Sequence, residues 1–160
     1  MTTDAERLQE LADRLKPGER LLGLDLGTRT IGLALSDTGR SIATALRTLK
    51  RTKFQKDADA LLEECTKHDV GGLILGLPLN MDGSEGPRVQ ATRAFARNLA
   101  GRTDLPIAFW DERLSTVAAE RVMIDADMSR GKRAQKIDAA AAAFILQGVL
   151  DRLRTLEPDT

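Results

Sequence analysis

Cysteine and aromatic residues are scarce in this chain of 160 residues. The single cysteine, Cys65, cannot form an intrachain disulfide, so the sequence is compatible with a reducing compartment. Tyrosine is absent, and one tryptophan and four phenylalanines do not indicate a platform on which nucleic-acid bases stack. We therefore expect neither a disulfide-stapled domain nor a protein that holds its ligand by aromatic stacking.

The sequence also lacks long apolar runs and an excess of either positive or negative residues. The longest apolar runs, around Gly71–Leu79 and Ala139–Leu146, are far shorter than the roughly 20 residues of a membrane span. The polar, acidic start Met1–Glu6 is unlike a secretory signal. With 42% hydrophobic and 30% charged residues, the sequence predicts a soluble, cytoplasmic, single-domain protein with a substantial core.

Global charge predicts no partner, because 24 Lys and Arg balance 24 Asp and Glu. The charge is nevertheless uneven, since four basic residues fall within seven positions: Arg130, Lys132, Arg133 and Lys136. A neutral enzyme can still bind nucleic acid if one of its faces collects the basic groups. Without other information, this run is equally well explained as a solvated loop.

Apolar periodicity and turn residues predict the element order βββαβαβαα. Capping-box spacing starts a helix over residues 3–16, which Pro17-Gly18 ends. Three short apolar segments with tight turns, at 20–26, 30–36 and 42–48, predict an antiparallel meander. The remaining expected elements are a helix over 53–68, a strand over 70–77, a loop over 78–87 followed by a helix, a strand over 106–110, a helix from Ser115 to about 126, and a buried helix over 137–153.

This order predicts an α/β fold with a five-stranded mixed sheet. Three strands form the meander, two more run parallel to the first, and helices cover both faces. We expect an N-terminal helical extension over residues 1–18, the main domain over 19–154 and a polar tail over 155–160. Leu8, Leu11 and Leu15 share one face of the added helix, and we expect them to pack within the chain rather than form a dimer interface.

Three acidic residues occupy unusual places. Asp25 interrupts an otherwise apolar strand, where an isolated carboxylate is costly unless it is compensated. Glu112 follows the last strand, and Asp138 lies early in the apolar last helix. The carboxyl ends of parallel strands meet at one sheet edge. Three carboxylates converging there would repel each other unless Mg²⁺ or Mn²⁺ lay among them, and two such ions can clamp a phosphodiester.

Each acid also has a simpler explanation. Asp25 alone would more often be a strand-end residue satisfied by backbone N–H groups. Glu112 could pair with Arg113 or Arg121, and Asp138 could simply favour the N-terminus of a helix. Only their combination favours a metal site.

Four motifs, in order and at matching spacings, resemble the YqgF family of RNase H-like nucleases, which are related to the RuvC Holliday junction resolvases. The resemblance covers about residues 20–152. The motifs are Gly23–Asp37, Gly76–Ser84, Asp111–Thr116, and Lys132–Arg133 with Lys136–Ala141.

The resemblance implies a metal-dependent nuclease whose metal-binding catalytic residues are Asp25, Glu112 and Asp138, with Mg²⁺ or Mn²⁺ as cofactor. It also implies a role in maturing the 5′ end of precursor 16S ribosomal RNA. RuvC-type resolvases carry a glutamate at the end of the fourth strand and a second aspartate after the last one. Gly76 or Leu77 and Ala141 stand there in this chain, so the resemblance to resolvases is weaker than that to YqgF proteins.

Beside such a carboxylate cluster, the basic run is better explained as a phosphate-contacting segment, and loop 78–87 becomes a candidate flap that grips the substrate. The residues expected to contact nucleic acid are Arg29, Asn80, Ser84, Arg130, Lys132, Arg133 and Lys136. The protein could act as a monomer or a homodimer.

Three other functions remain open. Cleavage of a four-way DNA junction would be the work of a symmetric dimer. A non-catalytic ribosome-assembly factor would keep the fold and bind RNA without cutting it. Residues 23–28 also resemble the first phosphate loop of actin-like ATPases and sugar kinases, but those proteins bind nucleotide between two such domains, and this chain has room for one.

Overall fold

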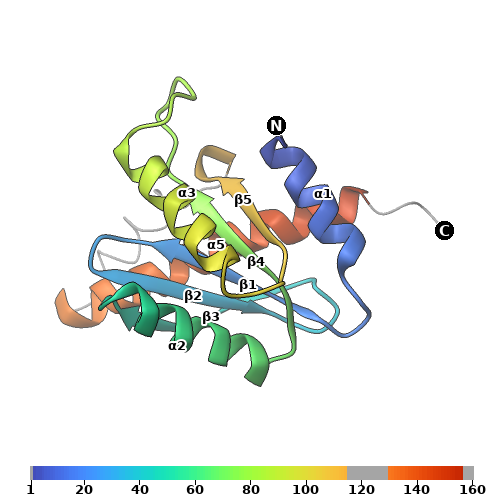
Figure 1. Ribbon diagram of the computed structural model, residues 1–160, viewed down its shortest axis with the longest axis horizontal. Coiled ribbons are helices and arrows are strands. Elements are labelled where there is room, and N and C mark those ends of the chain that lie inside the picture. Colours follow the sequence, from blue (N-terminus) through green and yellow to red (C-terminus); the bar gives the residue numbers. More distant parts are fainter. Residues whose placement is uncertain (1, 115–129, 157–160) are drawn as a thin grey trace.

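The computed structural model describes residues 2–114 and 130–156, with side chains of 130–138 excepted. A five-stranded mixed sheet runs through its centre in the order β3-β2-β1-β4-β5 (Figure 1). The strands are β1 (Arg20–Leu26), β2 (Thr30–Ser36), β3 (Ala43–Lys50), β4 (Val70–Leu77) and β5 (Ile107–Asp111). The first three pair antiparallel, whereas β4 pairs parallel with both β1 and β5. The predicted α/β fold and its mixed sheet are confirmed.

Helices cover both faces of this sheet. On one face, α2 (Phe54–Lys67) and α3 (Pro87–Ala100) pack on a core that includes Leu22, Leu24 and Leu26. On the other face, α1 (Asp4–Arg14) and α5 (Arg130–Leu156) pack on Leu21 and Ile74. Because side chains alternate along a strand, β1, β2, β4 and β5 each contribute residues to both cores.

The helix α1 belongs to the same packed unit as the sheet. Thr3 caps it, since its Oγ1 accepts a hydrogen bond from the backbone N–H of Glu6 at 3.1 Å, as the sequence predicted. Leu8 is 6% exposed and Leu11 is fully buried, both against the α5 side of the sheet. The expectation that these leucines pack within the chain is therefore confirmed.

Several element boundaries differ from those expected, most of them by one or two residues. β3 ends at Lys50 rather than 48, because its pairing with β2 continues to Thr30. The last helix begins at Arg130 rather than 137, so the basic run 130–136 lies in helical backbone and not in a loop. Arg, Lys, Gln and Ala are strong helix formers, and this propensity outweighs the lack of apolar residues.

Two further expectations lie wholly or partly outside the described residues. The helix expected over 115–126 falls in residues 115–129, and the polar tail begins within α5, which continues to Leu156. Within the described part of the chain, no helix is both long and apolar enough to cross a bilayer.

Candidate active site at the carboxyl edge of the parallel strands

Asp25 lies near the carboxyl end of β1 and is 9% exposed. A Cβ atom on Gly23 would lie 2.9 Å from Cβ of Leu146 and 3.2 Å from the carbonyl oxygen of Ala142, both in α5. Asp25 is two residues further along the strand, so its side chain is on the same face. The glycine therefore allows α5 to approach the sheet closely beside Asp25.

Glu112 comes to this face from β5, the edge strand of the sheet. It begins a 3₁₀ turn, η1 (Glu112–Leu114), directly after β5. Its Cγ lies 3.2 Å from the position that a Cβ on Gly76 would take, and Ile145 of α5 is on that same side. Leu24 pairs with Leu75, so Asp25 and Gly76 are the next positions along the paired strands β1 and β4. Asp25 and Glu112 therefore lie on the same α5 face, at the carboxyl edge of neighbouring strands.

Asp138, the third expected acid, lies in the backbone of α5, one helical turn before Ala142. Its side chain is outside the described residues, as are those of Arg130, Lys132, Arg133 and Lys136. Where side chains are described, no group of three or more acidic, histidine or cysteine residues is arranged to hold a metal ion. Only two members of the expected trio can therefore be located by their side chains.

The loop after β4 is held in shape by its own polar groups. The Nδ2 of Asn80 donates to Oγ of Ser84 at 2.9 Å, and the backbone N–H of Ser84 donates to Oδ1 of Asp82 at 2.9 Å. Gly83 has a φ of 87°, which a glycine adopts without strain. Met81 is 90% exposed at the tip. Asn80 and Ser84, predicted to contact nucleic acid, thus also build the flap that would do so.

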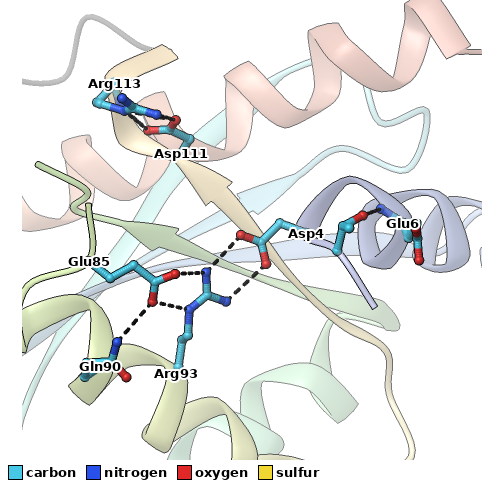
Figure 2. A network of polar contacts seen from close by, with 8 residues as sticks. Asp4, Glu6, Glu85, Gln90, Arg93, Asp111 and Arg113 are labelled. Carbon is cyan, nitrogen blue, oxygen red and sulfur yellow. Dashed lines mark hydrogen bonds and ion pairs between the residues drawn. The ribbon is translucent and has the colours of Figure 1, made fainter. Parts of the chain in front are cut away.

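Arg113 ties this flap to the end of β5. Its Nη2 donates to Oδ2 of Asp111 at 2.7 Å, and its Nη1 donates to the carbonyl oxygen of Met81 at 3.2 Å (the Asp111 pair is in Figure 2). Burial raises the pKa of the Asp111 carboxyl, but the hydrogen bonds from Arg113 outweigh this, so the pKa is lowered. The residues on both sides of Glu112 are therefore fixed by an ion pair, which limits where its carboxylate can move.

A second network fixes the far end of the flap. Arg93 of α3 donates to Asp4 of α1 at 3.0 Å and to Glu85 at 2.8 Å, and Gln90 also donates to Glu85 (Figure 2). The two carboxylates hold the pKa of Arg93 above its ordinary value, with the bonds to Asp4 as the largest cause. The charge of Arg93 is therefore matched by carboxylates within the chain.

Three arginines surround the turn that follows Asp25. Arg29 is exposed in the turn itself. Arg51 donates from Nη1 to the carbonyl oxygen of Gly27 at 2.7 Å, and Arg88 donates from Nη2 to that of Leu26 at 3.3 Å. Arg51 is not among the residues that the sequence pattern indicated, because nothing local signals that the segment after β3 returns to the end of β1.

Three other reactive side chains among the described residues have roles within the fold. Burial raises the pKa of the Cys65 thiol to about 12, so thiolate, the nucleophilic form, is negligible at neutral pH. His68 directly follows α2 and pairs with Glu64 at 3.2 Å. Asp37 accepts the backbone N–H groups of Ser41 and Ile42, so it holds the turn between β2 and β3.

The chain matches, over residues 19–152, the family described as "RuvX: Holliday junction resolvase". A protein of Chelativorans sp. (strain BNC1) named "Putative pre-16S rRNA nuclease" is 62% identical over 152 residues, which are 95% of each chain. A protein of Methylocella silvestris with the same name is 58% identical and covers 99% of each chain.

Solved structures of resolvases share the fold. Thermus thermophilus RuvC in complex with a Holliday junction aligns with a TM-score of 0.55, 14% sequence identity and coverage of 86% of this chain and 97% of that one. The yeast mitochondrial Holliday junction resolvase aligns with a TM-score of 0.51 at 14% identity, covering 98% and 88%. At such identity the likeness extends to the fold alone. The family match over most of the chain and relatives near 60% identity show that this chain belongs to the RuvX (YqgF) family of RuvC-like nucleases.

Proposed function

We propose that this protein is a divalent-metal-dependent nuclease that hydrolyses phosphodiester bonds in precursor 16S ribosomal RNA. One structural observation supports the proposal: Asp25 and Glu112 lie on the same face at the carboxyl edge of the parallel strands. The relatives named for this substrate match the chain over nearly their full length. Asp25, Glu112 and Asp138 are the proposed catalytic residues.

The donor set fits Mg²⁺ or Mn²⁺, because carboxylate oxygens are the ligands these ions prefer, and the chain's one histidine and one cysteine lie at the end of α2. When bound, such ions would supply an activated water and stabilise the leaving oxygen. Asp25 and Glu112 would hold the cations from the strand ends and Asp138 from α5. The packing of Gly23 and Gly76 against α5 would keep the strand-borne carboxylates in place.

The remaining proposed residues would bind the RNA backbone. Arg29 lies in the turn between β1 and β2, four residues after Asp25, and Asn80 and Ser84 lie in the flap that follows β4. Arg130, Lys132, Arg133 and Lys136 belong to the first turns of α5, before the position of Asp138. Both in sequence and in backbone position, these groups are near the carboxylates. The positive charges among them would therefore offset the repulsion between the acids and the phosphates.

Cleavage of a DNA junction is the alternative suggested by the family description. Two positions weigh against it. The space above Gly76, where resolvases carry a glutamate, is taken by Glu112 and Ile145, and Ala141 is fully buried in the core. We infer that β5 supplies the carboxylate that resolvases supply from β4.

The test is to offer the purified protein precursor 16S RNA and a four-way DNA junction, each with Mn²⁺, with EDTA, and with the Asp25→Asn variant. We expect Mn²⁺-dependent cuts in the RNA near the mature 5′ end, which EDTA and the substitution abolish. Symmetric nicks in the junction with an intact RNA would instead establish the resolvase alternative. Binding of either substrate without cleavage would support a non-catalytic assembly factor.

A further inference from the structure

We propose that Arg51 and Arg88 form a phosphate-binding subsite at the carboxyl end of β1, which takes a backbone phosphate next to the one that is cleaved. The inference rests on the proposed nuclease function, because it assigns the ligand as the same RNA strand. It adds a contact on the side of the sheet opposite to the carboxylates.

Both arginines are held by the backbone of β1 and its turn. Arg51 donates to the carbonyl oxygen of Gly27, two residues beyond Asp25, and Arg88 donates to that of Leu26, one residue beyond it. The Arg51 guanidinium also lies 5.7 Å from the ring centre of Phe95. A guanidinium has five N–H donors, so one carbonyl bond leaves most of them for another acceptor.

The segment that carries Arg51 is itself fixed. Asp57 is 4% exposed and accepts hydrogen bonds from both the backbone N–H and the hydroxyl of Thr52, each at 3.0 Å. This bond network holds the turn between β3 and α2 and therefore the direction in which Arg51 leaves it. A preorganised arginine loses less conformational entropy when it binds an anion.

The charges of these two arginines are not matched by carboxylates among the described residues, unlike those of three other arginines. Arg93, Arg102 and Arg113 each form an ion pair with an aspartate or glutamate. Among the residues whose side chains are described, no carboxylate lies within ion-pair distance of Arg51 or Arg88. A carbonyl bond orients a guanidinium but leaves its full positive charge available for a phosphate.

The start of α3 adds to this charge instead of offsetting it. Gly86 provides no side-chain cap, the first turn contains no acidic residue, and Arg88 is the second residue of the helix. A cation at the positive end of a helix dipole is unfavourable by itself. A bound phosphate would neutralise Arg88, Arg51 and the helix end together, which explains why this arrangement is tolerated.

The two arginines and the carboxylates lie on opposite sides of the sheet, so they would bind different phosphates. Leu24 and Leu26 face α2 and α3, as does Phe95 under Arg51, whereas Asp25 faces α5. A phosphate at the two arginines is therefore across the strand end from one at the carboxylates. The subsite would hold the strand beside the cleaved bond and contribute to affinity.

The test measures binding of precursor 16S RNA to the Asp25→Asn protein over a range of salt concentrations. Arg51→Gln and Arg88→Gln each keep an N–H donor for the carbonyl while removing the charge. We expect each to weaken binding about threefold to tenfold, and to reduce the slope of log affinity against log salt by about 0.7 to 0.9. Arg51→Lys and Arg88→Lys, which keep the charge, should retain the parental slope.

Arg14→Gln is the matched control. Arg14 is also an exposed arginine bonded to a backbone carbonyl, that of Asp104 at 2.9 Å, but at the opposite edge of the sheet. It should leave affinity and slope unchanged. The Asp25→Asn protein is the reference for binding. If it binds the RNA and both Gln variants bind with the same affinity and the same salt dependence, the proposed subsite is wrong while the nuclease proposal stands. If the Asp25→Asn protein does not bind the RNA, both proposals fall.

Discussion

The Cγ of Glu112 lies 3.2 Å from the point that a Cβ atom on Gly76 would occupy. A glycine on β4 thus makes room for a carboxylate that arrives from β5. The same point is 2.6 Å from Cδ1 of Ile145, so α5, β4 and η1 meet above one residue without a side chain. The position of the proposed catalytic glutamate therefore depends on residue 76 being a glycine, which has no side chain.

We predict that Gly76→Ala lowers both activity and stability. The added methyl must displace Ile145 and push Glu112 by a few tenths of an ångström. Overpacking of this kind costs about 1–3 kcal/mol of unfolding free energy, and a small displacement of a catalytic group costs on the order of tenfold to a hundredfold in rate. Urea denaturation and RNA cleavage measure the two effects.

The double variant Gly76→Ala with Ile145→Val separates them. Valine lacks Cδ1, the nearest atom to the new methyl, so stability should recover in part while Glu112 stays displaced and cleavage stays slow. Recovery of full activity together with stability would mean that Glu112 does not need this position.

Asp4 links α1 to Glu85, at the far end of the flap, through Arg93 (Figure 2). We predict that Asp4→Asn reduces the unfolding free energy by about 0.5–1 kcal/mol at low salt, and by less at high salt, because the ion pair is partly exposed. Thermal denaturation at two salt concentrations measures it. Glu6→Gln is the control, because it removes an acid from the same helical turn without touching Arg93. If it lowered the unfolding free energy by the same amount and with the same salt dependence, the effect would belong to the helix dipole instead.

The Asp111–Arg113 pair predicts a pH dependence with a definite sign. Its hydrogen bonds lower the pKa of Asp111 below the ordinary 3.8, so the folded state favours the ionised carboxyl. That contribution is present above the unfolded pKa and is lost as pH falls through the lowered folded value. Asp111→Asn should therefore cost about 1 kcal/mol of stability at pH 7 and almost nothing well below pH 3.8. A deficit that is constant from neutral to acid pH would show that the charge of Asp111 is not what stabilises the strand end.

Several parts of the fold could be predicted from the sequence because they depend on local patterns. The bounds of β1, β2 and β4 follow from unbroken apolar runs between turn residues, and the observed strands begin and end where these runs do. Asp25 could be singled out because a buried carboxylate is unfavourable in an otherwise apolar strand. Glu112 could be singled out because it directly follows a strand parallel to β1.

Other parts depend on contacts that no local pattern signals. Arg93 joins segments 89 and 8 residues away in sequence, and Arg51 returns to a carbonyl 24 residues earlier. Arg113 gives no sign in the sequence that it binds Asp111 and the flap rather than Glu112. The start of α5 was misplaced for a different reason, since helix propensity extended it through residues that carry no apolar period.

Binding of Mn²⁺ in the absence of RNA tests the central claim most directly. Titration followed by the electron paramagnetic resonance signal of free Mn²⁺ should show binding to the wild-type protein, with affinity lowered about tenfold or more in Asp25→Asn and in Glu112→Gln. Arg14→Gln should bind as the wild type does. Equal Mn²⁺ affinity in the wild-type, Asp25→Asn and Glu112→Gln proteins would contradict a metal site at this edge of the sheet.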